Sequence, residues 1–415
     1  MRTLCSQIRI LALVSALAGC LSAAAASTAD GDRLYGRITL ADGEVLEGFI
    51  RWGGTETAWV DLFNGGKRIS EEHMRQLKEL MPEHEEEKPT YFLGLRLDDG
   101  DEDSNRRASA VRFGQIRSIE ILNRSDARLT LRSGRQITYY AGSNDMGTAL
   151  GTSVIEDAEK GEVKLRWRGV ERIDFKAPPQ GARSKVGSRI HGVLTTEQGE
   201  TFTGYITWDR DESLSNEELD GEQDGEDYSL PFSQIASIEK ESRRASKVKL
   251  KDGRELVLSG TNDVDNDNRG IVVAVPEWGE VIVPWRDYRS LVLQDPEKPL
   301  LYDDFTESAP LRGTVTDESG KTYRGQIRWD NDESYTWETL DGEQDDWSYS
   351  LLFSAIESIE KTNRGARVKL RQGPTFELED SADVDEDNNG IIVELDDGRR
   401  VLVRWKDFQQ AVFEP

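Results

Sequence analysis

Three glycines and one tryptophan occur three times with the same spacing in this 415-residue chain, and this pattern constrains its fold more than any other feature. We call each set of four residues a ruler, and its last residue the ruler tryptophan. Gly192, Gly199, Gly204 and Trp208 are separated by steps of 7, 5 and 4 residues. The same steps separate the members of two further sets, which are Gly36, Gly43, Gly48 and Trp52, and Gly313, Gly320, Gly325 and Trp329. Equal spacings at three places indicate an internal repeat, so we expect a tandem array of similar units.

Each ruler marks a β-hairpin. In the first copy apolar and polar residues alternate from Leu34 to Leu40, turn at Asp42 and Gly43, and alternate again up to Trp52. Alternation interrupted by Asp-Gly is typical of a hairpin. The glycine inside the returning strand, Gly48 in this copy, predicts a bulge or a tight bend.

A second signature follows each hairpin and shows that every repeat is itself double. Its three-residue step, as in Phe353-Ser-Ala-Ile356-Glu-Ser-Ile359, predicts one 3₁₀ turn leading into a strand. The signature begins at Phe113, Phe232 and Phe353, and recurs about fifty residues later at Trp167, Trp285 and Trp405. A lone module of about 50 residues buries too little surface to be stable, so two modules are expected to pair in each domain.

The segment Gly325-Gln-Ile327-Arg-Trp-Asp330, together with Phe353 to Ile359, resembles an Sm-like or SH3-like small barrel. This resemblance implies an all-β fold of three tandem repeats, each a pair of small β-barrel modules. Sm proteins bind RNA through an Asn after that Asp and through an Arg-Gly pair, and this chain has neither in matching places. The whole chain resembles repeat proteins of bacterial envelopes.

The repeats set the expected domain organisation. We expect a signal peptide at 1–19, a tether at 20–33, the first repeat at 34–175 with a helical insertion at about 60–96, a linker at 176–187, the second repeat at 188–293, a linker at 294–309 and the third repeat at 310–415. Within the insertion, Ser70 to Met81 predicts a helix with Ser70 as its N-cap. Its apolar side, with Met74, Leu77 and Met81, is expected to pack on its own barrel, and a partner-binding helix is the alternative.

The N-terminus predicts export. The apolar run from Ile10 to Ala18 is too short to span a bilayer and ends in Leu17-Ala18-Gly19-Cys20, which resembles a bacterial lipobox. Lipidation at Cys20, with Leu21 after it, would place the chain at the outer membrane, facing the periplasm or the surface, and the lipid would be its only membrane contact. Cleavage after Ala24-Ala25-Ala26, giving a soluble periplasmic or secreted protein, is the alternative.

Composition limits the classes of partner and of catalytic chemistry that this chain can have. The formal charge of −26 disfavours nucleic acid and favours cations or basic surfaces. The only cysteines are Cys5 and Cys20, and the three histidines, His73, His84 and His191, do not recur between repeats, so thiol and histidine catalysis are not expected. We therefore expect a non-catalytic binding or scaffold module for an envelope protein or a glycan. A carboxylate-based hydrolase or a carbohydrate-binding protein is the alternative.

The tryptophans fall into two groups. Six of them occupy the recurring strand-end positions, in phase with apolar neighbours, and are expected in the core. The other four, which lie outside the ruler, are candidates for an aromatic contact surface, with local lids over the core as the alternative. These four are Trp59, Trp278, Trp337 and Trp347.

Acidic loops provide the sharpest functional signal. In the second repeat Trp208 precedes Asp209, Asp211 and Glu212, and a later loop carries Asp263, Asp265 and Asp267. The third repeat matches both with Asp330, Asp332 and Glu333, and with Asp383, Asp385 and Asp387. Carboxylates at positions one, three and five can converge on Ca²⁺, although Asn268 and Asn388 replace the usual glycine and no helices flank the loops. Plain acidic turns are the alternative.

The first repeat provides an internal comparison. It has Gly53-Gly54-Thr55 after Trp52, and Asp145-Met-Gly after Asn144, so it lacks both acidic loops together. Joint presence in two repeats and joint loss in one predict that the two loops meet in space. Calcium held between them is the corresponding cofactor hypothesis.

Overall fold

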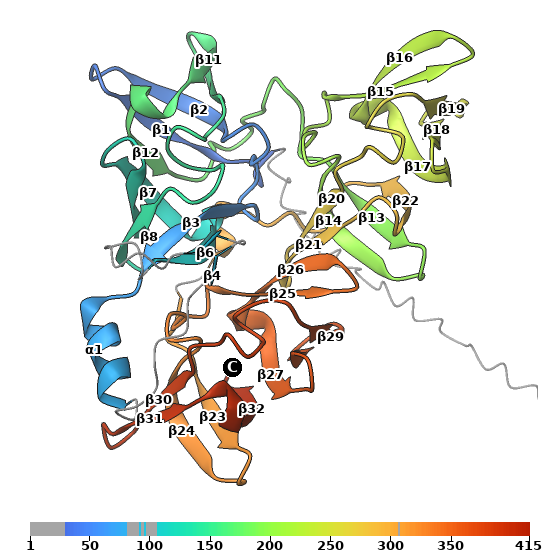
Figure 1. Cartoon of the computed structure of the whole chain (residues 1–415). Helices are drawn as coiled ribbons and strands as arrows, with labels where there is room; N and C mark the ends of the chain where they lie inside the picture. The colour runs from blue at the N-terminus through green and yellow to red at the C-terminus, as the bar shows by residue number, and fades with distance from the viewer. Residues whose placement is uncertain (1–29, 81–90, 93–94, 97–105, 306–307) are drawn as a thin grey trace, which may run out of the picture.

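The computed structural model describes residues 30–80, 91–92, 95–96, 106–305 and 308–415. In that part the fold is all-β, with three large antiparallel sheets of 10, 12 and 8 strands, one two-stranded sheet and one α-helix. Figure 1 shows three lobes that follow one another along the chain. The predicted signal peptide, Cys20, His84 and Met81 lie outside the described residues.

The three repeats supply equivalent sets of strands. The first comprises β1 (Tyr35–Leu40), β2 (Val45–Arg51), β3 (Leu62–Arg68), β6 (Arg106–Arg112), β7 (Ile116–Ile121), β8 (Asp126–Leu131), β9 (Gln136–Tyr140), β10 (Ser153–Asp157), β11 (Gly161–Leu165) and β12 (Val170–Phe175), with β4 (Tyr91–Phe92) and β5 (Leu95–Arg96) in the insertion. The second comprises β13 (His191–Thr196), β14 (Thr201–Thr207), β15 (Glu218–Gln223), β16 (Glu226–Pro231), β17 (Ile235–Ser242), β18 (Ala245–Leu250), β19 (Glu255–Ser259), β20 (Ile271–Val275), β21 (Gly279–Val283) and β22 (Tyr288–Leu293). The third comprises β23 (Arg312–Asp317), β24 (Thr322–Arg328), β25 (Thr339–Gln344), β26 (Trp347–Leu352), β27 (Ile356–Lys361), β28 (Ala366–Leu370), β29 (Thr375–Leu378), β30 (Ile391–Leu395), β31 (Arg400–Val403) and β32 (Phe408–Phe413).

The two halves of a repeat interleave instead of closing separately. In the second repeat the strand order is β21-β20-β14-β13-β22-β17-β18-β19-β15-β16, and the first repeat has the same order with its own strands. The opening hairpin, β13 and β14, therefore lies between β20 and β22, which both come from the second half. Because β22 also separates β13 from β17, neither half can close on itself. The described strands form open sheets, so the expected pairs of small closed barrels are not found.

The predicted hairpins are present with their turn glycines, but the glycine inside the returning strand serves a different purpose from the one expected. Gly199 turns the hairpin at a φ of 87°, as the Asp-Gly-type turn requires. Gly192 lies directly opposite Gly204 without a register shift, so the predicted bulge is wrong. A Cβ on Gly204 would lie 2.4 Å from the carbonyl oxygen of Ala274 on β20. Glycine is needed because two strand backbones approach closely there.

The local signatures behave as predicted at five of their six places; the sixth, at Trp285, is a turn without 3₁₀ geometry. Five of the six predicted turns are 3₁₀ turns: Phe113–Gln115, Trp167–Gly169, Phe232–Gln234, Phe353–Ala355 and Trp405–Asp407. The six strand-end tryptophans are all buried, with exposed fractions of at most 7%. Trp208 packs edge-on against Trp285 and Tyr288, with ring centroids 6.0 and 5.3 Å apart. The expectation that these tryptophans form the core is therefore confirmed.

A strand pairing joins the second repeat to the third. The hairpin of β25 and β26 belongs by sequence to the third repeat, but β26 pairs with β21, so this hairpin extends the sheet of the second repeat. Figure 1 shows the two strands between the second and third lobes. Trp278, Phe376 and Tyr349 pack together beside this junction, with Tyr349 and Phe376 centroids 4.7 Å apart.

One acid in each repeat both closes its own turn and binds a cation from another repeat. Glu217 Oε2 accepts the backbone N–H groups of Ser213 and Leu214, and its Oε1 lies 2.8 Å from Arg51 of the first repeat. The equivalent acids, nine residues after each ruler tryptophan, are Asp61, which binds Arg189 at 3.2 Å, and Glu338, which binds Lys67. These contacts connect the first repeat with both of the others.

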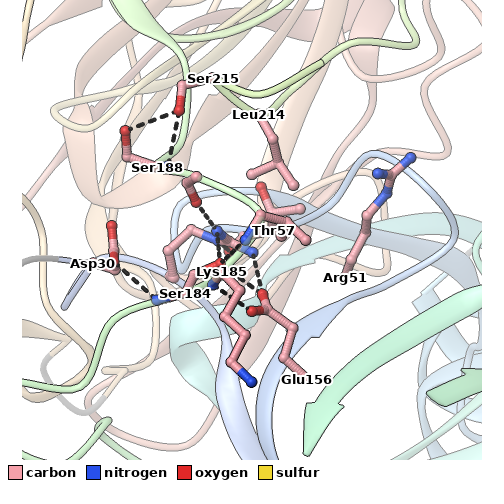
Figure 2. Close-up of polar contacts among 12 residues, drawn as sticks. Asp30, Arg51, Thr57, Glu156, Ser184, Lys185, Ser188, Leu214 and Ser215 are labelled. Atoms are coloured by element: carbon pink, nitrogen blue, oxygen red, sulfur yellow. Dashed lines mark hydrogen bonds and ion pairs between the residues drawn. The ribbon is translucent and has the colours of Figure 1, made fainter. Parts of the chain in front are cut away.

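The end of the chain segment between the first and second repeats is held by polar contacts (Figure 2). Ser184 donates its backbone N–H to Asp30 at 3.0 Å and its hydroxyl to Glu156 at 2.6 Å. Arg33 donates to the Ser184 hydroxyl at 3.1 Å and also to the carbonyl of Gly187. Near its end, the predicted linker is therefore hydrogen-bonded to Asp30, Arg33 and Glu156.

The predicted helix is present as α1 (Glu71–Leu80), and Ser70 caps it by accepting the N–H of His73 at 3.1 Å. The expectation that it packs on its own barrel is wrong, because its principal contact is β31 of the third repeat (Figure 1). The amide oxygen of the buried Gln76 accepts a hydrogen bond from Arg328 of β24 at 3.1 Å. The helix thus bridges two repeats.

Candidate functional site: the acidic loops and the repeat junctions

The first acid of each predicted calcium loop is a structural residue. The indole Nε1 of Trp208 donates to the carbonyl oxygen of Asp263 at 2.9 Å. The Asp263 carboxylate accepts the backbone N–H of Asp220 at 2.7 Å, so one residue fastens the tryptophan to the start of β15. The same two bonds connect Trp329, Asp383 and Asp341 in the third repeat, and Trp52, Asp145 and Asn64 in the first.

The remaining acids of these loops shape turns. Asp265 accepts the N–H of Asp267 at 2.9 Å, and Asn268 accepts that of Gly270 at 2.9 Å. Asp385, Asp387, Asn388 and Gly390 repeat both bonds in the third repeat. In the second repeat Asp263 is buried, Asp265 is half-buried and Asp267 is exposed, so the acids at positions one, three and five do not share one environment. The described residues contain no group of three or more His, Cys, Asp or Glu placed to hold a metal ion, and the predicted convergence on Ca²⁺ is not found.

The two acidic loops of the second repeat, and those of the third, do meet, as their joint presence predicted. Asp209 is fully buried and accepts hydrogen bonds from the Arg269 side chain at 2.8 and 3.1 Å and from Asn262. Asp211 lies 3.2 Å from the same guanidinium. In the third repeat Asp330 accepts the side-chain amide of Asn389 at 3.0 Å. In the second repeat a cationic side chain of the chain itself, Arg269, therefore binds the two aspartates that follow Trp208.

Backbone conformation explains why the first repeat differs. Asp209 and Arg210 have φ values of 46° and 57°, in the left-handed region, and Asp330 and Asn331 have values of 41° and 65°. Gly53 and Gly54 occupy the equivalent positions, with φ values of 61° and 117°. Glycine adopts this region at little cost and Asn or Asp tolerate it, so both sequences satisfy the same turn.

Each repeat also places a glutamate beside its tryptophan-binding aspartate. Burial, and secondarily Asp263, raise the pKa of Glu212 to about 8, and burial raises the pKa of Asp263 to about 6. Burial together with Asp145 raises the pKa of Glu56 well above its ordinary value. Sequence reasoning missed Glu56 and Asp145. The signal that could have found Glu56 is its spacing, because Glu56, Glu212 and Glu333 all follow the ruler tryptophan by four residues.

The acids of the third repeat surround one lysine of the first. Lys67 on β3 is 7% exposed, and its Nζ lies 3.4 Å from Asp332, 3.5 Å from Glu333 and in direct contact with Glu338. Burial opposes the charge on Lys67, but Glu338, Asp332 and Glu333 outweigh it and raise the pKa of the lysine well above its ordinary value. No motif marked Lys67 in the sequence, because its partners lie more than two hundred residues away.

The four tryptophans predicted to form a contact surface are buried, so this prediction is wrong. Trp59 packs on Tyr302 with centroids 4.6 Å apart, and Trp278 and Trp347 both pack on Phe202, at 6.3 and 5.9 Å. Trp337 belongs to the same apolar cluster as Trp59. These side chains fill junctions between repeats. Their positions look like exposed loops only when each repeat is considered alone.

An acid-lined hollow lies where the second and third repeats meet. One cation, Arg286, lies at its wall, bound to Asp346 and 3.3 Å from Asp287. Asp345, Asp346 and Asp380 have φ values of 55°, 66° and 58°, which places them in tight turns. The lining residues are Gln198, Arg286, Asp287, Glu343, Asp345, Asp346, Glu379 and Asp380.

Comparisons with models of known families, with curated proteins and with solved structures find no match to this chain. Within the described residues, no helix combines the length and the apolar character needed to cross a membrane.

Proposed function

We propose that this chain is a non-catalytic scaffold of the bacterial cell envelope, and that its acid-lined hollow binds a basic segment of a partner protein. The observation that carries the proposal is the composition of the hollow, since six of its eight lining residues carry a carboxylate and one is an arginine. A concave surface of one charge attracts the opposite charge and rejects like charge. The net charge of −26 strengthens that preference.

The junctions between repeats support a scaffold role. The hollow takes residues from both the second and the third repeat, so its shape depends on the β21–β26 pairing and on the ion pairs that hold the repeats together. A binding surface built across rigid elements loses little conformational entropy when the partner binds. The proposal places the chain in the envelope through export and lipidation at Cys20, and the lipid is its only membrane contact.

Neither alternative function gains a specific observation. Glycan binding through Trp59, Trp278, Trp337 and Trp347 is not proposed, because their rings are covered by the protein itself. The Glu212 and Asp263 carboxylates lie beside a buried tryptophan instead of facing each other across a substrate groove. The likeness to Sm-like and SH3-like barrels is proposed only for the local succession of strand, 3₁₀ turn and strand.

Binding of a basic peptide tests the proposal. The probe is fluorescently labelled oligolysine, titrated at physiological salt against the exported chain carrying Cys20→Ser, and its anisotropy is measured. The double variant Asp345→Asn/Asp380→Asn should weaken binding by about tenfold or more, because it removes two charges from the hollow. Asparagine tolerates the positive φ at both positions.

A matched control separates the hollow from net charge. Asp252→Asn/Asp397→Asn removes two charges from exposed turns elsewhere and should leave the affinity almost unchanged. Equal loss of affinity in both double variants would show that oligolysine senses only the overall charge, and the proposed site would be wrong. Retention of the Cys20→Ser form in the membrane fraction would contradict the lipid anchor.

A further inference from the structure

Two sheet ends remain open in the described part of the chain. The three large sheets have six edge strands, and four of these contact another element. The edge strand β25 contacts two others, β6 and β29, and the edge strand β31 contacts α1. The remaining two are β11, which pairs only with β10, and β16, which pairs only with β15. An edge strand that nothing covers presents unpaired backbone N–H and C=O groups along its free side and can pair with a further strand.

The molecule contains a completed version of the same junction. β21 occupies the place in the second repeat that β11 occupies in the first, and β26 occupies the place in the third repeat that β16 occupies in the second. β21 and β26 pair antiparallel, with Gly279 opposite Leu351, Glu280 opposite Ser350 and Val281 opposite Tyr349. A Cβ on Gly279 would lie 1.9 Å from the carbonyl oxygen of Ser350, so this glycine is required by the arriving strand.

The open ends carry the sequence of the completed junction. β11 begins with Gly161-Glu-Val163, identical to Gly279-Glu-Val281 of β21, and β16 contains Tyr228-Ser-Leu230, identical to Tyr349-Ser-Leu351 of β26. At Gly161 the space that β26 fills beside Gly279 is empty, since a Cβ there would have no neighbour within 4 Å. The two open strands therefore have the residues that let β21 and β26 meet.

Transferring the register brings complementary side chains together. Gly161 comes opposite Leu230, and Val163 opposite Tyr228, as in the completed junction. The pair Ile282 and Ser348 is replaced by Lys164 and Asp227, which have opposite charges. Opposite charges directly across an antiparallel pair stabilise the pairing, and like charges oppose it.

The aromatic residues that flank the completed junction are also replaced by charged residues beside β11 and β16. Trp278 and Trp347 both pack on Phe202 at the completed junction. Their counterparts beside the open ends are Lys160 and Glu226, again a cation and an anion. Lys160 is exposed and currently binds Glu44. A junction made from β11 and β16 would be more polar than the internal one, and hence reversible.

We propose that β11 of one copy of this chain pairs with β16 of a second copy, antiparallel and in the register of β21 with β26. Within one chain the two strands are the ends of different sheets, and Figure 1 shows them on separate lobes. The occupant is a second copy because the matching strand is supplied by the chain itself. This interface is separate from the acid-lined hollow, so either proposal can fail without the other.

Sedimentation equilibrium of the exported chain carrying Cys20→Ser tests this interface. At physiological salt, which screens the repulsion between two acidic chains, mass should increase reversibly with concentration. Lys164→Glu and Asp227→Lys should each raise the dissociation constant by about tenfold or more, because each places like charges opposite one another. The double variant should restore association, whereas Lys251→Glu, on an exposed turn, should have little effect.

Disulfide formation between two variants tests the register. Lys164→Cys and Asp227→Cys, each also carrying Cys20→Ser, should form a mixed disulfide dimer when combined under mild oxidation, faster than either variant alone. A monomer at all concentrations would overturn the proposal. Association that survives both charge reversals, or that the double variant does not restore, would place the contact elsewhere and also overturn it.

Discussion

A single aspartate in each repeat binds a tryptophan through its carbonyl group and a neighbouring hairpin through its carboxylate. Asp145, Asp263 and Asp383 occupy this position, including in the first repeat, which lacks the acidic loops. The joint presence of the two acidic loops in the second and third repeats, and their joint absence from the first, predicted that the loops meet, and they do. It did not predict the role of the acids, because periodic carboxylates look the same whether they bind a metal ion or backbone N–H groups.

The first prediction concerns Asp263. Asp263→Ala should lower the free energy of unfolding by about 1–3 kcal/mol, because the part-buried hydrogen bond from the N–H of Asp220 to the Asp263 carboxylate is lost. The loss should be the same with millimolar CaCl₂ or with EDTA, as measured by urea unfolding followed by tryptophan fluorescence. A wild-type chain that calcium stabilises, alongside a variant that it does not, would instead restore the calcium loop.

The paired glycines give the second prediction. Gly204→Ala should lower the free energy of unfolding by about 3 kcal/mol or more, because its methyl group would lie 2.4 Å from a strand carbonyl oxygen. Gly169→Ala is the matched control, since its methyl group would meet nothing within 4 Å. Equal stability of the two variants in urea would show that the strand backbones do not approach closely at Gly204.

At the scale of elements, the sequence predicted kinds and bounds better than partners. The helix was expected from Ser70 to Met81 and spans Glu71–Leu80, and the 3₁₀ turns lie where their three-residue step placed them. The contact of α1 with β31 and the pairing of β26 with β21 were not predicted. Periodicity identifies which face of an element is apolar, but the surface that covers it depends on residues far away in the chain.

The third prediction concerns the lysine at the junction of the first and third repeats. Lys67→Met should lower the free energy of unfolding by about 3–5 kcal/mol near neutral pH, because three buried carboxylates lose their cation. The deficit should shrink as the pH falls, since burial and the neighbouring Asp332 raise the pKa of Glu333 well above its ordinary value, and protonation of Glu333 removes one uncompensated charge. Thermal unfolding of the variant and the wild type, from neutral to mildly acidic pH, measures the difference.

A pH-independent deficit would show that Lys67 acts by packing alone. Glu338→Gln offers a comparison, because it removes one carboxylate from the same cluster and leaves two to compensate the lysine. It should therefore cost less than Lys67→Met at neutral pH, and the difference between the two variants should narrow in mildly acidic buffer as Glu333 is protonated.

At the scale of the whole molecule, three similar units form one structure. Ion pairs join the first repeat to the second and third, and a strand pairing joins the second to the third. All ten tryptophans are buried, including four that fill junctions. The sequence revealed the number of repeats because their spacing is regular. It did not reveal how they pack, since the residues at the junctions differ from one repeat to the next.

The fourth prediction follows from the buried acids of the tryptophan loops. The folded pKa of Glu212, about 8, and that of Asp263, about 6, lie above the values of these groups in the unfolded chain. The folded state therefore binds more protons in that window, and stability should fall as pH rises from about 4.5 to 8. The melting temperature should decrease over this range, and Glu212→Gln should flatten the decrease. A melting temperature that rises across the window would contradict it.

The most direct test of the central claim, that the three repeats fold as one unit, is differential scanning calorimetry of the exported chain carrying Cys20→Ser. Repeats locked by buried ion pairs and a shared sheet should unfold in one transition, with a calorimetric enthalpy equal to the van't Hoff enthalpy. Two or three resolved transitions, or a van't Hoff enthalpy about one third of the calorimetric value, would show that the repeats unfold independently.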